Sequence, residues 1–226
     1  MSDMRIFSPG IVRFLFQLIF CLSLAQMVTA QLPQIRRFVP AALVKNPLYT
    51  GLQGTYSGAL SGKVLALGYP DATVASKSKA GLWLLVIPDT GALIRIVRET
   101  IPDTEARLGA SCAISGNLLA VGAPGYQGGR GAVFVFNLHT GKQLFRAINE
   151  VNEPNALGTS VALQGDILAV GAPDTNAPNG MDQSGKVRLY RVSTGELLTV
   201  LAGSSPVQVG DTFGISLAVQ GRQLAV

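Results

Sequence analysis

The chain has 226 residues, with 18 Lys and Arg, 13 Asp and Glu and a formal net charge of +5 at pH 7. This excess of positive charge is small and thinly spread, with Arg36 and Arg37 as its one basic cluster, so it gives no support to nucleic-acid binding. A single histidine and two cysteines leave zinc binding and Cys-His catalysis without support.

Residues 1–30 have the features of a secretory signal peptide. Arg5 and Arg13 supply positive charge around an apolar run over residues 14–24, and small or branched residues stand at 28–30, where cleavage is expected. The run is shorter than the ~20 residues of a membrane span. We therefore expect a secreted, periplasmic or cell-surface protein without a stable membrane span after signal removal; an uncleaved anchor is the alternative.

After a lead-in over residues 31–52, a repeated frame fills the rest of the chain. Residues 119–124 and 168–173 both read Leu-Ala-Val-Gly-Ala-Pro, and each copy follows a Leu-Gly-x-Ser motif. The frame starts again at Phe213, and a weaker copy covers residues 57–70. A spacing of about 50 residues indicates a repeat architecture in which no unit can bury a core alone.

Each repeat unit divides into four short segments separated by turn residues, which is typical of β-structure. In the best-defined unit the predicted strands are residues 111–114, 118–121, 131–136 and 144–147. The second segment is apolar throughout, so we expect it to be covered on both faces and to end at its Gly-Ala-Pro sequence. A Thr-Gly pair before the last segment predicts a tight hairpin turn.

The third segment of each unit is apolar at alternate positions, which predicts one face that is buried in every copy. The opposite face varies, from Phe134 in one unit to Arg188 in the next. The alternate apolar positions are Trp83, Val133 and Val187, followed by Leu85, Val135 and Leu189.

Four antiparallel strands per unit predict an all-β fold, and specifically a β-propeller of four-stranded blades. A β-sandwich would show no fixed repeat, and a solenoid would have shorter repeats. The units are residues 53–102, 103–152 and 153–208 as three blades, with residues 209–226 as the first strands of a truncated fourth. Because propellers close with about four to eight blades, we expect the chain to be a fragment of a longer protein.

The repeated frame resembles the FG-GAP repeat family, known from the propeller of integrin alpha subunits, and looks closest to the variant in secreted bacterial proteins. The resemblance covers residues 54–226. It implies a propeller that usually closes with about seven blades, more than this chain carries. The matching residues are Phe213 and Gly214 (Leu-Gly in the other copies), Gly165 and Asp166, and the Gly-Ala-Pro sequences at 122–124 and 171–173.

Asp174, Asn176 and Asp182 are the candidate metal ligands, since oxygen donors at loop positions 1, 3 and 9 with a glycine between resemble a calcium loop. Pro178 stands where a third oxygen is expected. The calcium loop of the integrin relatives also precedes the Gly-Ala-Pro strand, where this chain has only the turn at residues 164–166. A polar surface loop is therefore the simpler interpretation, and calcium is the one cofactor candidate.

Two other residues that often carry chemistry have structural interpretations here. Cys112 aligns with apolar or small residues of the other units, which predicts a buried strand position rather than a reactive thiol. His139 stands beside a Thr-Gly turn, where an exposed polar residue is ordinary. The sequence therefore offers no catalytic residues.

Export, a repeat fold and the lack of a nucleophile–base pair favour a non-enzymatic interaction or adhesion module, whose loops bind an extracellular protein or glycan. The alternatives are a quinoprotein-like propeller enzyme and a calcium-binding propeller that serves as the scaffold for a missing C-terminal domain. Quinoprotein blades share the Thr-Gly turn but favour a tryptophan after it, whereas Trp83 precedes that turn, and the Gly-Ala-Pro strand is foreign to them.

Overall fold

The computed structural model of the chain describes residues 49–50, 52, 57–87, 92–97, 103–149, 155–174, 184–203 and 210–226. These residues all belong to one compact body, Val39–Val226. The predicted signal peptide lies outside the described residues. The body is built of strands, and its one described helix, α3 (Tyr126–Gly129), has only four residues, three of them with positive φ. The structure thus confirms the all-β class.

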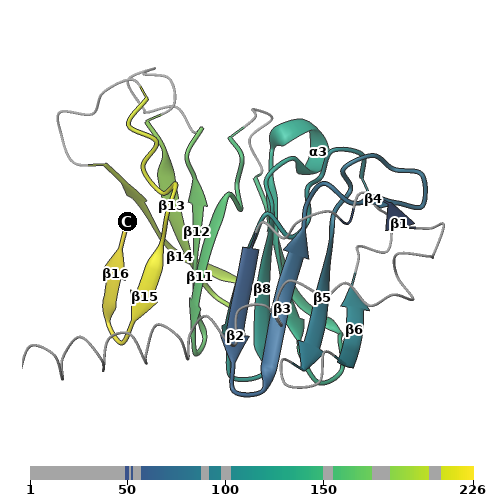
Figure 1. The fold of residues 1–226 in the computed structure, drawn as a ribbon. Helices are drawn as coiled ribbons and strands as arrows, with labels where there is room; N and C mark the ends of the chain where they lie inside the picture. Colours follow the sequence, from purple (N-terminus) through teal and green to yellow (C-terminus); the bar gives the residue numbers. More distant parts are fainter. Residues whose placement is uncertain are drawn as a thin grey trace, which may run out of the picture. The chain divides into compact units, whose positions relative to one another are not determined.

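Three four-stranded antiparallel sheets follow one another along the chain (Figure 1). Within each sheet, every strand pairs with the strand of that sheet that follows it along the chain, so each sheet is a meander. The first sheet consists of β2 (Ser57–Ser61), β3 (Val64–Tyr69), β5 (Leu82–Ile87) and β6 (Ala92–Val97). The second consists of β7 (Ser111–Ser115), β8 (Leu118–Ala123), β9 (Ala132–Asn137) and β10 (Gln143–Ile148). The third consists of β11 (Ser160–Gln164), β12 (Ile167–Ala172), β13 (Lys186–Arg191) and β14 (Glu196–Ala202).

Two short strand pairs complete the described structure. A hairpin of β15 (Ala218–Gln220) and β16 (Gln223–Ala225) lies beside β11. In the lead-in segment, β1 (Tyr49–Thr50) pairs with β4 (Thr73–Val74), which belongs to the loop between β3 and β5. Residues 49–50 are therefore tied to the loop between two strands of the first sheet.

The second strand of each repeat extends further than the sequence predicts. β8 continues through Gly122 and Ala123 and stops before Pro124, whereas the sequence predicts its end at Val121. β12 likewise ends at Ala172. The Gly-Ala pair is part of β8 because Gly122 and Ala123 both pair with residues of β9.

This contact joins a glycine of each second strand to the backbone of the next repeat unit. A Cβ atom at any of these glycines would lie 2.0 Å or less from a carbonyl oxygen of that unit, a distance at which no side chain fits. The carbonyl belongs to the glycine of the Leu-Gly or Phe-Gly motif, whose φ is between +90° and +93°. The three contacts are Gly68 with Gly109, Gly122 with Gly158, and Gly171 with Gly214.

A serine hydroxyl donates a hydrogen bond to the same carbonyl oxygen. Each serine is also the cross-strand partner of the second-strand glycine, so serine and glycine approach the carbonyl together. The bonds are Ser57 Oγ to Gly109 O at 2.8 Å, Ser111 Oγ to Gly158 O at 2.8 Å and Ser160 Oγ to Gly214 O at 2.6 Å. We call each set of two glycines and one serine a glycine–serine clasp. Beside each clasp, a parallel bridge pairs the glycine before the third strand with the next unit, as in Gly185 with Phe213.

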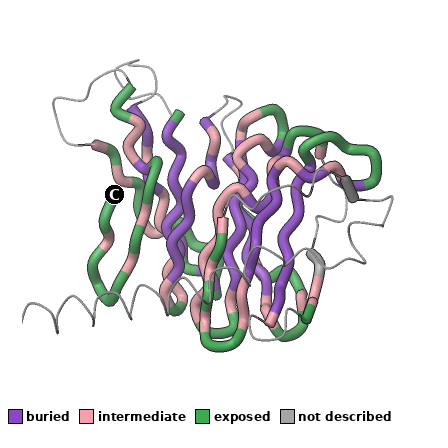
Figure 2. Tube along the Cα trace, viewed as in Figure 1, coloured by how far each residue is buried: buried purple, intermediate pink, exposed green. Residues whose placement is uncertain are grey.

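Apolar side chains fill the space between successive sheets. At the first junction Trp83 packs against Phe136, with ring centroids 5.3 Å apart. At the second, Val133 and Val135 pack with residues of β12 and with Tyr190. Figure 2 shows buried residues along the inner strands and exposed ones at the hairpin turns.

The prediction of an invariably buried third-strand face is confirmed at five of its six positions, and the sixth, Leu189, is half-buried. Cys112 on β7 is also half-buried and packs against the first core, as expected for a strand position. Burial raises the pKa of its thiol, which disfavours the reactive thiolate.

The clasp predicts that alanine is far more damaging at Gly68 than at Gly58, a glycine of the same sheet. A methyl group at Gly68 overlaps Gly109 O and Ser57 Oγ, and such overpacking costs about 1–3 kcal/mol or more. At Gly58 the nearest atom is 3.8 Å away, so alanine there should stabilise by about 0.4–1 kcal/mol. Urea unfolding followed by Trp83 fluorescence measures both effects at the first junction. An equal loss of stability in both variants would show that the clasp does not require glycine.

Candidate functional site

Of the three sequence-predicted calcium ligands, only Asp174 is among the described residues. Asp174 lies two residues after the end of β12 and is exposed. Asn176 and Asp182 lie outside the described residues. Within the described ranges, no group of three or more His, Cys, Asp or Glu side chains is arranged to hold a metal ion. The calcium loop stays a prediction.

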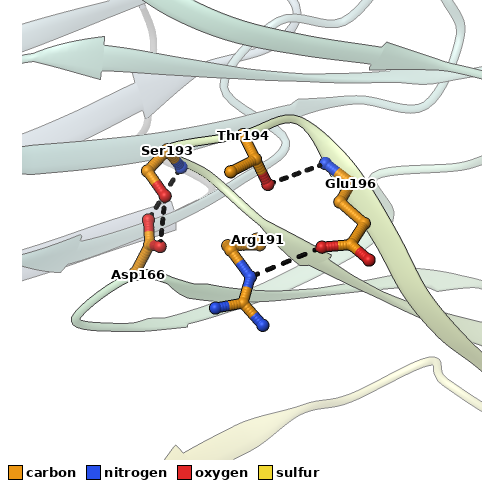
Figure 3. Close-up of polar contacts among 5 residues, drawn as sticks. All are labelled: Asp166, Arg191, Ser193, Thr194 and Glu196. Carbon is orange, nitrogen blue, oxygen red and sulfur yellow. Dashed lines mark hydrogen bonds and ion pairs between the residues drawn. The ribbon is translucent and has the colours of Figure 1, made fainter.

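In the turn between β11 and β12, the carboxylate of Asp166 accepts hydrogen bonds from Ser193 (Figure 3). Asp166 accepts from the backbone N–H of Ser193 at 2.7 Å and from the Ser193 hydroxyl at 2.5 Å. On the same hairpin, Arg191 Nε lies 3.6 Å from Glu196 Oε2. The Asp166–Ser193 bonds, which we call the turn clamp, tie the β11–β12 turn to the β13–β14 turn.

The second sheet has a neutral version of the turn clamp. Asn117 occupies the position of Asp166, and its Oδ1 accepts a hydrogen bond from the backbone N–H of His139 at 3.1 Å. The side chain of His139 is exposed, as the sequence predicts. Since an asparagine serves in the same place, the carboxylate of Asp166 has a structural role in joining two turns.

The hydrogen bond from the Ser193 hydroxyl holds the pKa of Asp166 below its usual value. A lowered pKa means that the turn clamp stabilises the fold above the usual aspartate pKa of about 3.9 and is lost as the pH falls through the lowered value. We expect an NMR titration of the Asp166 carboxyl to give a midpoint below about 3.9, and Ser193→Ala to raise it toward that figure. Identical midpoints in the two proteins would contradict the assignment.

A cleft of about 480 Å³ lies between the second and third sheets. One wall is formed by β10 and residue 149, and the other by β13 and β14. The volume is in the range of small-molecule binding sites. The residues that line it include Phe145, Asn149, Lys186, Arg188, Tyr190 and Leu197.

Lys186 and Arg188 give the cleft its positive charge. They stand two residues apart on β13, so both side chains project from one face of the strand. Tyr190 continues this face and contacts Phe145 of β10, with ring centroids 5.4 Å apart, which shows that the face looks toward the second sheet. Arg146 also lines the cleft. It lies on the same face of β10 as Ile148, two residues further on, and Ile148 packs against the core between the first and second sheets.

Asn149 holds the guanidinium of Arg188 in place. Arg188 Nη2 donates to Asn149 Oδ1 at 2.7 Å, and Asn149 itself is fully buried. The backbone carbonyl of Asn149 accepts two hydrogen bonds from Arg130, at 3.1 and 2.5 Å. A buried, well-bonded acceptor therefore orients Arg188 before any ligand is present.

The cleft exists because the third sheet departs from the repeat. Counted from the glycine that opens the third strand, Lys186 replaces Ala132 and Arg188 replaces Phe134. In the second sheet these two residues are 0% and 1% exposed and fill the junction with the first sheet. Cations in the same places cannot be buried without a charged partner, so this part of the second junction stays open. The change from Phe134 to Arg188 is visible in the sequence, but the opposite wall, formed by β10, is not, so the sequence alone did not predict a binding site here.

No protein-family model matches the sequence, and no curated protein shows significant similarity to it. Among solved structures, the chain is similar to the crystal structure of the computationally designed Ika4 protein, with a TM-score of 0.52 and 18% identity over 77% of this chain and 85% of that one. The computationally designed Ika8 protein gives a TM-score of 0.51 and 19% identity, over 76% of this chain and 42% of that one. At these identities the similarity concerns the fold alone. In the parts of the chain that the structure describes, no helix has the length and apolar character needed to cross a membrane.

Proposed function

We propose that this chain is an exported, non-enzymatic binding module of the β-propeller type, similar to FG-GAP repeat proteins, and that it binds an extracellular protein or glycan. The observation that carries the proposal is the cationic cleft between the second and third sheets, which combines oriented polar groups with aromatic side chains on a packed β scaffold.

The way in which successive sheets meet supports the propeller arrangement. Their first strands lie side by side, β2 with β7, β7 with β11 and β11 with β15. A glycine–serine clasp recurs at each of these junctions with nearly the same distances. Closely similar contacts repeated between equivalent strands are what the blades of a propeller require.

The chemistry of the cleft supports binding rather than catalysis. Its described lining carries cations, an asparagine, aromatic rings and aliphatic groups, with no carboxylate, thiol or imidazole among them. A nucleophile with an adjacent base is the minimum that covalent catalysis needs. Trp83, which bears on the quinoprotein alternative, is fully buried in the core between the first two sheets. This supports a structural role for it.

The proposal predicts that the full chain, recovered after export, binds saturably to a partner on an array of extracellular proteins and of neutral and acidic glycans. Because the cleft is cationic, binding should weaken as the salt concentration rises from about 0.05 to 0.5 M. The absorbance spectrum and a dye-linked alcohol oxidation assay of the same sample serve as the comparison. A bound-quinone spectrum with oxidation activity, or no saturable binding to any protein or glycan, would overturn the proposal.

A further inference from the structure

We infer that the cleft between the second and third sheets binds an anionic saccharide, one whose sugar ring carries a carboxylate or a sulfate group. The inference rests on the proposed function and deepens it, since it names the class of partner and the side chains that recognise it.

The charge of the site argues for an anion. Lys186 and Arg188 face the same space, and among the described residues neither forms an ion pair. Arg188 uses one of its N–H donors on Asn149, which leaves the planar fork oriented to meet a second acceptor. A guanidinium fork matches the paired oxygens of a carboxylate or sulfate, and a lysine ammonium adds a second positive charge beside it.

The rest of the cleft argues for a sugar. Phe145 and Tyr190, whose rings are in contact, line the cleft next to the cations. Leu197 and Val200 of β14 are 48% and 46% exposed, so the outer rim is apolar. A sugar ring has apolar C–H faces for such surfaces and hydroxyl groups for the polar ones. A compact cleft of about 480 Å³ holds one to a few sugar rings, whereas an extended acidic peptide needs a longer groove.

The repeat itself provides an internal comparison. The corresponding surface of the second sheet carries Ala132 and Phe134, which are buried against the first sheet. The same scaffold is therefore closed where these positions are apolar and open where they are Lys186 and Arg188. The double variant Lys186→Ala/Arg188→Phe gives the third sheet the residues that the second sheet has at these positions. It should close the cleft with side chains that already fit this scaffold.

The test is isothermal titration of the full chain with two probes, a trigalacturonate for the carboxylate and a heparin-derived tetrasaccharide for the sulfate. We expect at least one to bind, and the double variant to lose at least about tenfold in affinity, as for other charge-assisted contacts. Lys63→Ala/Lys142→Ala removes the same charge at exposed positions outside the cleft and should stay within about twofold of the unmodified chain. Trp83 fluorescence reports whether the variants are folded. Arg188→Lys, which keeps the charge but removes the fork, should weaken binding even if the double variant fails to fold.

The outcomes separate this inference from the proposed function. Cellotriose bound as tightly as the acidic probes, or acidic probes bound equally by the folded double variant, would overturn the inference and leave a glycan-binding module. Binding of an oligoglutamate but of neither saccharide would replace the saccharide with an acidic peptide. Inorganic sulfate that binds as tightly as the saccharides would reduce the site to a simple anion site and also overturn the inference. Absence of any partner on the array would remove the proposed function itself.

Discussion

Backbone-to-backbone contact at a pair of glycines is the constraint on which this structure depends. In each clasp a carbonyl oxygen passes through the space that a Cβ of the preceding unit would occupy, and a serine hydroxyl donates to that oxygen. The contact recurs three times, each time between a glycine of one unit and a glycine of the next. It explains why the small residues of the frame recur together: the second-strand glycine supplies the space, the next glycine supplies the positive φ, and the serine satisfies the carbonyl.

The clasps fix the spacing of the sheets at their first two strands. The side chains of the third and fourth strands therefore decide whether the outer part of each junction is filled or open. At the first junction, Trp83, Phe134 and Phe136 fill the space and make a continuous core. At the second, Lys186 and Arg188 cannot enter a core, and a cleft results. One repeated contact near the first strands thus permits side-chain variation at the outer strands, so that a closed junction and an open one occur in the same chain.

The electrostatics of the cleft depend on local arrangement rather than on total charge. The net charge of +5 is modest for 226 residues. Two cations on one face of β13, one of them oriented by the buried Asn149, concentrate positive charge beside a low-dielectric wall, where its effect on a ligand is strongest. The carboxylate of Asp166, by contrast, is used within its own pair of turns.

The sequence by itself determined the all-β class, the position of most strands in each repeat, the turn glycines and the buried face of the third strand. These features follow from the alternation of side chains and from turn chemistry, which are properties of neighbouring residues. Only the tertiary structure showed that the Gly-Ala pair continues the strand, that the serine of one unit is bonded to the glycine of the next, and that Arg188 faces Asn149 across a cleft. The last two of these features join residues of different units. A periodic pattern shows which face of a strand is buried, but it does not show which residue of another unit lies opposite that face.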